Sequence, residues 1–340
     1  MDRILVVRVG ALGDTLMVTP AVRALKKKYP DAEVDFLCSE SAAPLIELNP
    51  YITALYQIRR RNLPYMLSLE KQRLAIHLRS RRYDLALLYE TAPRYHQLLL
   101  HSRIHRIGGF KEIAFNPAEH CIVNYLTAAG FPGSKPEDHR MDLPISPLDE
   151  KAAEQLIAQF KNPRIGLHLG YGPRGKKKNQ SDRLKGWGRE NFLRLSKMLI
   201  DRGADLVFTG SAEDLADIEF ICQPLPPGRA CVTAGKTRVR EFAAVLKKLD
   251  LFISVDTGPA HMAAAIGVPL IVLWGPAIYE QVRPIAPFSP IKILRVPPPC
   301  APCYGTPRKD SCRRNICMES ITPASVMEAA EDLLSALSKP

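Results

Sequence analysis

The chain alternates short apolar runs with stretches whose apolar positions recur every three to four residues. In the first half, runs of strand length occupy residues 4–9, 33–37, 54–58, 85–89 and 104–107, and helical patterns occupy 15–28, 42–48, 65–82, 95–101 and 118–129. Continuous apolar strands between amphipathic helices are typical of a parallel sheet that is covered on both faces. The first half therefore predicts a doubly wound α/β domain.

The alternation begins again after a loop rich in proline and glycine at residues 130–147. Further strands are predicted at 165–169, 205–209, 251–255, 270–274 and 291–296, and further helices at 190–201, 214–221, 240–249 and 259–266. A length of 340 residues favours two domains. We expect two Rossmann-like domains, residues 1–150 and 151–322, that face a cleft, followed by an amphipathic helix at 323–340.

Composition and charge narrow the class of protein. The chain has 46% hydrophobic residues, no apolar run of membrane-spanning length and no signal-peptide pattern at its start, so we expect a cytoplasmic globular protein. Its net charge is +12, and residues 59–111 alone hold twelve Lys and Arg against three acids. Such a segment is either a solvated helix face or the contact for an anion: nucleic acid, a phosphorylated or carboxylated substrate, or an acidic membrane surface.

The first turn, residues 8–14, joins the first strand to the first helix. Gly10 and Gly13 are three residues apart, which falls short of the full dinucleotide-binding pattern. Asp14 stands at the start of the helix, where a carboxylate either caps the helix or accepts a proton from a substrate hydroxyl. Both interpretations of Asp14 fit the sequence.

Two later segments have the composition of a phosphate site. Residues 171–185 follow a strand and contain six Lys and Arg, but they lack P-loop spacing. We interpret 176–178 as a surface loop, and Lys185, beside Trp187, as a candidate phosphate ligand; Trp187 belongs to either a cleft wall or the core. The turn within 251–276 places polar residues at a helix N-terminus, where backbone N–H groups and the helix dipole favour anions. Its candidate ligands are Ser254, Asp256, Thr257, Gly258 and His261.

Four of the eight cysteines cluster within residues 297–318. They form a C-x₂-C pair, Cys300 and Cys303, and a C-x₄-C pair, Cys312 and Cys317. Four thiols at this spacing in a cytoplasmic protein favour a structural metal, zinc or iron, over disulfides. Unliganded thiols or a reversible disulfide remain the alternative.

Several motifs together resemble one family. ILVVRVGALGD, HLG with a later KGW, FTGSAED and SVDTGPAHMAAAIGVPLIVLWGP are similar to the family 9 glycosyltransferases, typified by the ADP-heptose:lipopolysaccharide heptosyltransferases. The resemblance implies a GT-B architecture, with the acceptor on the N-terminal domain, the nucleotide-sugar on the C-terminal domain, and a last helix that returns toward the first domain. It also implies inversion at the anomeric carbon.

The resemblance assigns roles to residues of this chain. It implies that Asp14 is the general base and that Lys185 contacts the donor diphosphate. The donor site is implied at Asp256, Thr257, Gly258 and His261, with Thr237 at the nucleobase and Glu213 or Asp214 at the ribose. Arg8, Gly13 and Arg59–Arg61 are expected to face an anionic, lipid-linked acceptor at the inner face of the membrane. No catalytic cofactor is expected, because Lys185 and the helix N-terminus can stabilise the leaving group.

Two alternatives stay open. The same fold would also serve an enzyme that glycosylates another surface glycan or a protein side chain. The basic segment and the cysteine cluster would also fit a nucleic-acid-binding protein with a Cys₄ metal knuckle, although these two features lie in different predicted domains and no recognition element accompanies either.

Overall fold

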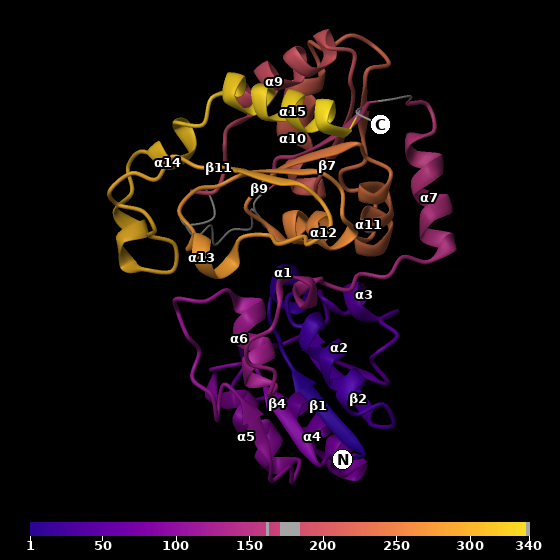
Figure 1. Cartoon of the computed structure of the whole chain (residues 1–340), viewed down its shortest axis with the longest axis vertical. Coiled ribbons are helices and arrows are strands. Elements are labelled where there is room, and N and C mark those ends of the chain that lie inside the picture. Colours follow the sequence, from indigo (N-terminus) through magenta and orange to yellow (C-terminus); the bar gives the residue numbers. More distant parts are fainter. Residues whose placement is uncertain (161–162, 171–183, 338–340) are drawn as a thin grey trace. The chain divides into compact units, whose positions relative to one another are not determined.

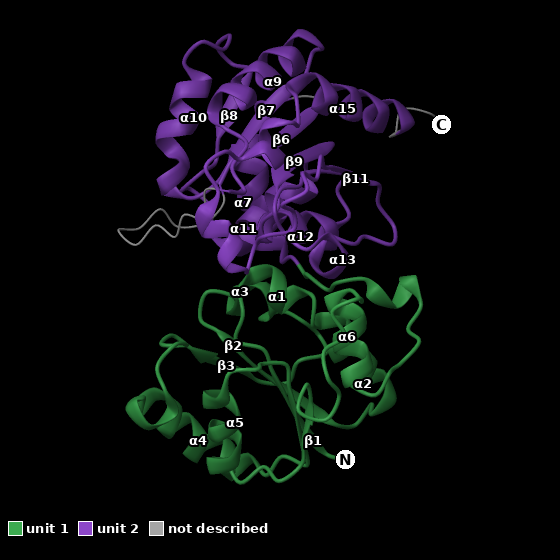
Figure 2. Ribbon diagram, turned by 90° about the vertical axis from the view of Figure 1, so that its left-hand side faces the viewer, with its two compact units in different colours: residues 1–144 green, residues 145–340 purple. Residues whose placement is uncertain are grey.

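The protein, analysed as a computed structural model that describes residues 1–160, 163–170 and 184–337, divides into two compact units (Figure 2). Unit 1 comprises residues 1–144 and unit 2 comprises residues 145–340. Each unit contains one parallel sheet, which confirms the predicted α/β class. The functions predicted for the two domains stay predictions.

The sheet of unit 1 has the order β3-β2-β1-β4-β5, and all of its pairings are parallel. Val7, in the central strand, is in register with Leu37 on one side and Leu88 on the other, so these strands end within two residues of one another. The strands are β1 Arg3–Val7, β2 Glu33–Ser39, β3 Leu55–Ile58, β4 Leu85–Leu88 and β5 Ile107–Gly109. Residues that follow them therefore share one edge of the sheet, its carboxyl edge.

Helices cover both faces of this sheet. The α helices are α1 Leu12–Leu16, α2 Thr19–Lys28, α3 Ala43–Ile46, α4 Leu69–Arg81, α5 Pro93–His101 and α6 Cys121–Ala128, and the 3₁₀ turns are η1 Tyr65–Leu67 and η2 Pro136–His139. The single helix predicted over 15–28 is two helices. Pro20 lies in the first turn of α2 and has no N–H to donate to a preceding turn, so the chain begins a new helix there.

Unit 2 has a six-stranded sheet of order β11-β10-β9-β6-β7-β8. Its strands are β6 Arg164–His168, β7 Asp205–Thr209, β8 Ala230–Val232, β9 Leu251–Val255, β10 Leu270–Leu273 and β11 Ile291–Leu294. Its helical segments are α7 Pro147–Ile157, α9 Arg189–Asp201, η3 Ala212–Asp214, α10 Leu215–Cys222, α11 Val239–Lys247, α12 Gly258–Ile266, α13 Tyr279–Val282, η4 Pro307–Ser311, α14 Ile316–Glu319 and α15 Pro323–Leu337. In Figure 1, α9 and α15 lie on one face of this sheet, and α11 and α12 lie on the other.

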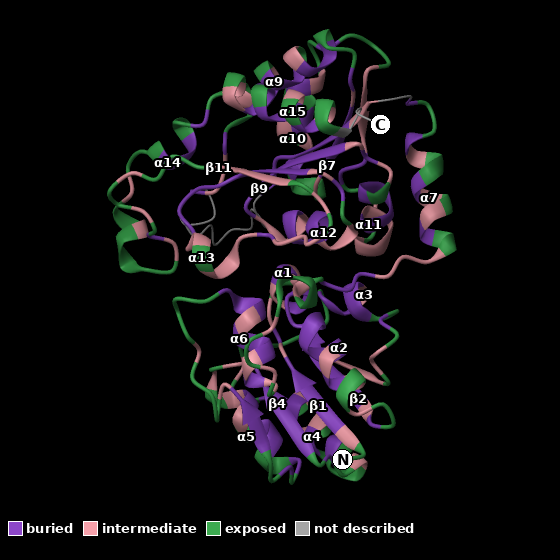
Figure 3. Ribbon diagram, viewed as in Figure 1, coloured by how far each residue is buried: buried purple, intermediate pink, exposed green. Residues whose placement is uncertain are grey.

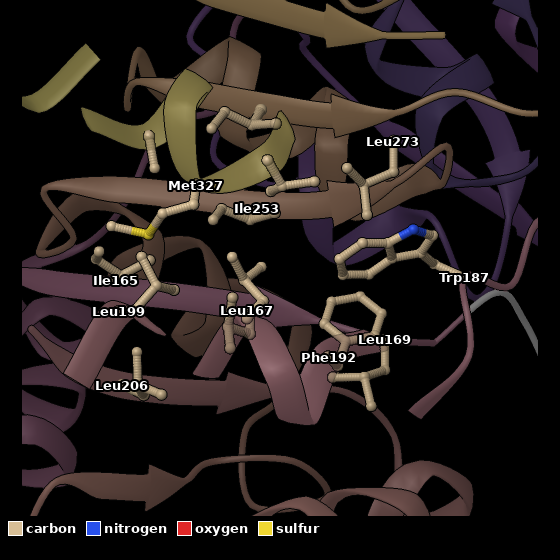
Figure 4. Close-up of a cluster of buried hydrophobic side chains, with 14 of the residues drawn as sticks. Ile165, Leu167, Leu169, Trp187, Phe192, Leu199, Leu206, Ile253, Leu273 and Met327 are labelled. Carbon is tan, nitrogen blue, oxygen red and sulfur yellow. The ribbon is translucent and has the colours of Figure 1, made fainter. Parts of the chain in front are cut away.

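The larger core lies between the unit 2 sheet and the helices α9 and α15. Figure 4 shows Ile165, Leu167 and Ile253 from the strands packed with Phe192 from α9 and Met327 from α15. The central strands of both sheets are buried and the edge strands β3, β8 and β11 are mostly half-buried, whereas the outer faces of the helices are exposed (Figure 3). The last helix is thus part of the unit 2 core, and its predicted return toward the first domain stays a prediction.

Candidate functional site

Arg8, the first residue after β1, pairs with two carboxylates at the carboxyl edge of the unit 1 sheet. Its guanidinium lies 3.1 Å from Asp14 and 3.2 Å from Glu90, which follows β4. The same guanidinium donates to the Tyr89 carbonyl at 3.0 Å. Although burial acts to lower the pKa of Arg8, the nearby Tyr125, Asp14 and Glu90 raise it overall. Arg8 is therefore a fixed cation that orients the two acids.

Asp14 is held in the first turn of α1 by two contacts. One carboxylate oxygen pairs with Arg8, and the other accepts a hydrogen bond from the Ala11 amide at 3.1 Å. The Asp14 carboxylate therefore accepts a backbone hydrogen bond at the start of the helix and still remains accessible, because 33% of its side chain is exposed. Gly10 permits this arrangement, since a Cβ at that position would lie 2.7 Å from the Asp14 Cβ.

The predicted acceptor arginines lie after β3, at the same edge. The Arg59 guanidinium makes a two-pronged contact with the Glu40 carboxylate, at 2.8 and 2.7 Å. Arg60 and Arg61 are exposed, and their backbone carbonyls accept hydrogen bonds from Lys71 and Tyr95. Gly13 is buried inside α1. In the part of the chain that the structure describes, no hydrogen bond or ion pair joins Arg59–Arg61 to Arg8.

In unit 2, Lys185 and Asp256 form an ion pair at the start of α12. The Lys185 ammonium lies 2.7 Å from the Asp256 carboxylate, and both side chains are largely buried, at 16% and 5% exposure. The ammonium also lies 4.4 Å from the centre of the Tyr304 ring. Asp256 directly follows β9, whereas Lys185 precedes α9, so the fold joins two motifs that are 71 positions apart. Predictions for 171–183 lie outside the described residues.

The turn that begins α12 has Thr257 as its N-cap residue. Its side chain donates to the Val255 carbonyl at 3.2 Å rather than capping the helix, and the Ser254 hydroxyl donates to the same carbonyl at 2.8 Å. Asp256 does not cap the helix, since its carboxylate contacts Lys185. Gly258 opens the helix and His261 is buried one turn further on. The helix N-terminus thus lies beside a lysine ammonium, the combination that suits a diphosphate.

The acidic motif at 211–214 resolves into two different roles. Asp214 is buried, and its carboxylate accepts hydrogen bonds from the Ser211 amide and hydroxyl at 2.8 and 2.9 Å. Gly170 and Gly210 make room for it, because a Cβ on either would lie within 2.7 Å of an Asp214 oxygen. Asp214 thus holds this turn together, the exposed Glu213 is the more accessible of the two, and the ligand contact predicted for this pair stays a prediction. Thr237, between β8 and α11, is half-buried.

His168, the last residue of β6, is a buried histidine that our sequence analysis did not select. Its ring Nδ1 lies 3.0 Å from the Thr209 hydroxyl at the end of β7, and its ring packs near Phe242 and Phe252. Burial lowers the pKa of His168 to about 4, against a smaller opposing effect of Asp214. The ring is therefore neutral at physiological pH.

Acidification should destabilise the protein through His168. The unfolded chain takes up this proton near pH 6.5 and the folded chain near pH 4, so the unfolded state binds more protons between these values. The free energy of unfolding should fall by up to about 3 kcal/mol as the pH drops through this window. Denaturant titrations of the wild type and His168→Asn at several pH values would measure it. An equally steep fall in His168→Asn would contradict the assignment.

The structure does not support the predicted metal site. Among the described residues, which include all four clustered cysteines, no group of three or more His, Cys, Asp or Glu is placed to hold a metal ion. The Cys312 thiol instead donates to the Arg314 carbonyl and the Cys317 thiol to the Asn315 side chain, both at 3.2 Å. Burial, together with the neighbouring thiols, raises the pKa of Cys317 to about 11.

Trp187 belongs to the core of unit 2, one of the two positions, cleft wall or core, that the sequence allowed. The side chain is 3% exposed, and its indole N–H donates to the Ile321 carbonyl at 2.7 Å. Its ring meets Phe192 edge to face, as Figure 4 shows. Trp187 thus anchors the segment that contains Lys185 to the end of the cysteine-rich loop.

Comparison with known proteins identifies the family. The sequence profile of glycosyltransferase family 9 (heptosyltransferase) matches residues 72–312. Lipopolysaccharide heptosyltransferase 3 of Escherichia coli is 30% identical over 294 residues, which cover 80% of this chain and 83% of the relative. The chain belongs to glycosyltransferase family 9. It is therefore an enzyme of glycosyl transfer, and this membership favours the enzyme over the nucleic-acid-binding alternative.

Solved structures confirm the predicted GT-B fold. A family 9 glycosyl transferase from Veillonella parvula DSM 2008 superposes with a TM-score of 0.82 at 20% identity, covering 99% of this chain and 98% of that one. The E. coli ADP-heptose LPS heptosyltransferase II gives 0.77 at 21% identity, with 100% of both chains covered. E. coli heptosyltransferase WaaC, solved with ADP, gives 0.67 at 16% identity and covers 97% and 99%.

Proposed function

We propose that this glycosyltransferase transfers a heptose from ADP-heptose to an anionic inner-core acceptor of lipopolysaccharide. Two of the proteins named above are lipopolysaccharide heptosyltransferases, and a third, the heptosyltransferase WaaC, was solved with ADP. The observation that carries the donor site is the Lys185–Asp256 pair beside the N-terminus of α12. A diphosphate needs a cation and backbone N–H groups together, and this turn supplies both.

The chemistry that fits these residues is a direct displacement with inversion. Asp14 removes the proton from the acceptor hydroxyl, and the resulting oxygen attacks the anomeric carbon of the heptose as the bond to the diphosphate oxygen breaks. Lys185 and the first turn of α12 stabilise the negative charge on the departing ADP. The proposed scheme consumes no cofactor.

The remaining site residues bind rather than react. We assign Glu213 to the ribose and Thr237 to the base of the donor, because Glu213 is exposed and Thr237 half-buried near the carboxyl ends of β7 and β8. His261, buried inside α12, supports the phosphate turn. On the acceptor side, the exposed Arg60 and Arg61 are the better candidates for anionic groups, since Arg8 is already occupied by two carboxylates.

The proposed acceptor determines where in the cell the reaction takes place. A lipid-linked glycan is reached at a membrane surface, so we propose that the protein acts from the cytoplasm in peripheral contact with the inner membrane. None of the helices in the described residues has the length and apolar content to cross a membrane.

Donor selection is the first test of this proposal. ADP-heptose and ADP should raise the melting temperature by several degrees at concentrations far above their dissociation constants, whereas UDP- and GDP-sugars should not. Equal shifts with all nucleotides would contradict the ADP assignment. Mass analysis of products formed from ADP-heptose and candidate acceptors then separates a lipopolysaccharide core from another surface glycan or a protein acceptor.

A further inference from the structure

Unit 1 exposes a group of large apolar side chains around the start of α4. Met66, Leu67, Leu69 and Ile76 are 68%, 74%, 69% and 72% exposed. Isolated exposed leucines are common, but four such side chains within eleven residues indicate a surface that is covered in use. The first two lie in the turn η1, and the other two lie on α4.

Hydrogen bonds from α4 hold this turn and the loop before it in place. Lys71 is fully buried, and its ammonium donates to the Arg60 and Leu63 carbonyls at 2.7 and 2.9 Å. The Gln72 amide donates to the Met66 carbonyl at 2.9 Å. Burial lowers the pKa of Lys71, a sign of the desolvation that the ammonium undergoes in order to fix the turn. The apolar tip is therefore a preformed feature.

The same segment is strongly basic. Residues 59–82 contain eight Lys or Arg and a single acid, Glu70. The Glu70 carboxylate is occupied by the backbone, since it accepts hydrogen bonds from the Arg59 and Arg60 amides at 2.7 and 3.0 Å. Arg73 and Arg79 are exposed on α4 near Ile76. The apolar side chains and the arginines Arg60, Arg61, Arg73 and Arg79 form what we call the basic apolar face.

A cavity of about 460 Å³ brings both kinds of side chain together. Arg59 and Arg60 line it with Leu63, Leu67 and Leu69. Glu40, which follows β2, lines it as well, so the cavity opens at the carboxyl edge of the unit 1 sheet. Glu70 lines the cavity too, so two carboxylates balance the two arginines there. The positive charge of the face comes instead from the exposed Arg61, Arg73 and Arg79 outside the cavity lining.

We propose that the basic apolar face docks on a bilayer that contains anionic lipids. Met66, Leu67 and Leu69 would enter the boundary between headgroups and acyl chains while the arginines contact lipid phosphates. Apolar insertion and a basic patch are the two signals that stable peripheral binding requires. Both signals lie on one face of the unit, and the acceptor proposed above is itself lipid-linked, so we take a bilayer rather than a protein as the occupant.

The inference extends the proposed membrane contact, but it rests on no step of the proposed chemistry. Docking at this face would place the bilayer beside the carboxyl edge that holds Asp14, which suits an acceptor drawn from the membrane. Its test therefore uses vesicles alone, without donor or acceptor, so that failure of the docking and failure of the enzymatic proposal remain distinguishable.

The experiment is co-sedimentation of the full chain with vesicles of phosphatidylglycerol and phosphatidylethanolamine, compared with vesicles of phosphatidylcholine. We expect binding to the anionic vesicles that weakens as salt rises. The double variant Leu67→Ser/Leu69→Ser should reduce binding by about tenfold or more, and Arg73→Gln/Arg79→Gln should weaken it and flatten the salt dependence.

The matched control is Leu148→Ser/Phe288→Ser, which removes two apolar side chains of unit 2 that are 75% and 74% exposed. This control should bind vesicles as the wild type does, and all variants should melt like the wild type. Wild-type binding by Leu67→Ser/Leu69→Ser would overturn the proposal. Equal binding to anionic and neutral vesicles would also overturn it. A third contrary result would be that the chain does not bind vesicles and that Leu67→Ser/Leu69→Ser only abolishes self-association in gel filtration.

Discussion

Replacing Asp14 by asparagine is expected to lower the rate of transfer by about 10²-fold or more while the fold is retained. Asparagine keeps an oxygen that can accept the hydrogen bond from the Ala11 amide, and it occupies the same space against Gly10. It cannot take the proton of an acceptor hydroxyl. Single-turnover rates with ADP-heptose and a core acceptor, together with the melting temperature, would measure both effects.

Glu90→Gln is the matched control for Asp14→Asn. Both acids pair with Arg8, at 3.2 and 3.1 Å, and both accept a backbone N–H, so each substitution removes one charge from the same guanidinium. If Asp14 is the base, Glu90→Gln should keep most of the activity. Comparable losses in the two variants would instead show that the acids act by holding Arg8, and near-full activity in Asp14→Asn would remove Asp14 as the base.

Much of the fold could be predicted because its strands are buried on both faces. Continuous runs such as 251–255 have no helical period and are bounded by turn residues, so each central strand was found within a few residues of its observed ends. The short edge strand β8 was missed, since its three half-buried residues make no apolar run. The helix α7 was also missed, although Ser146 caps it by accepting from the Asp149 amide.

The site could be predicted only in part. Asp14 and Asp256 each lie in a turn that follows a strand. Because parallel strands end at the same edge of a sheet, the sequence predicted that each residue lies at the carboxyl edge of its sheet. The partners could not be predicted in the same way, since Glu90 lies 82 positions from Arg8 and no local pattern joins them. The cysteine spacing was insufficient for a related reason: the four thiols are neighbours in the fold, but among the described residues no three of them are placed to hold one metal ion.

Lys185→Met is expected to lower the rate of transfer by about 10²-fold, because the leaving diphosphate loses its charge-neutralising partner. The substitution also leaves the Asp256 carboxylate buried beside an apolar side chain, which should cost about 3 kcal/mol of stability. Lys197→Met, on the exposed face of α9, is the control for loss of a lysine and should change neither quantity.

The double variant Lys185→Met/Asp256→Asn separates these two effects. Removing both charges leaves no unpaired ion, so the melting temperature should recover most of what Lys185→Met loses. Transfer should stay low, since no ammonium remains to meet the diphosphate, and the affinity for ADP should stay weak in calorimetric titrations. If the double variant recovered activity as well as stability, Lys185 would serve only to neutralise Asp256. The phosphate contact would then have to come from the N-terminus of α12 alone.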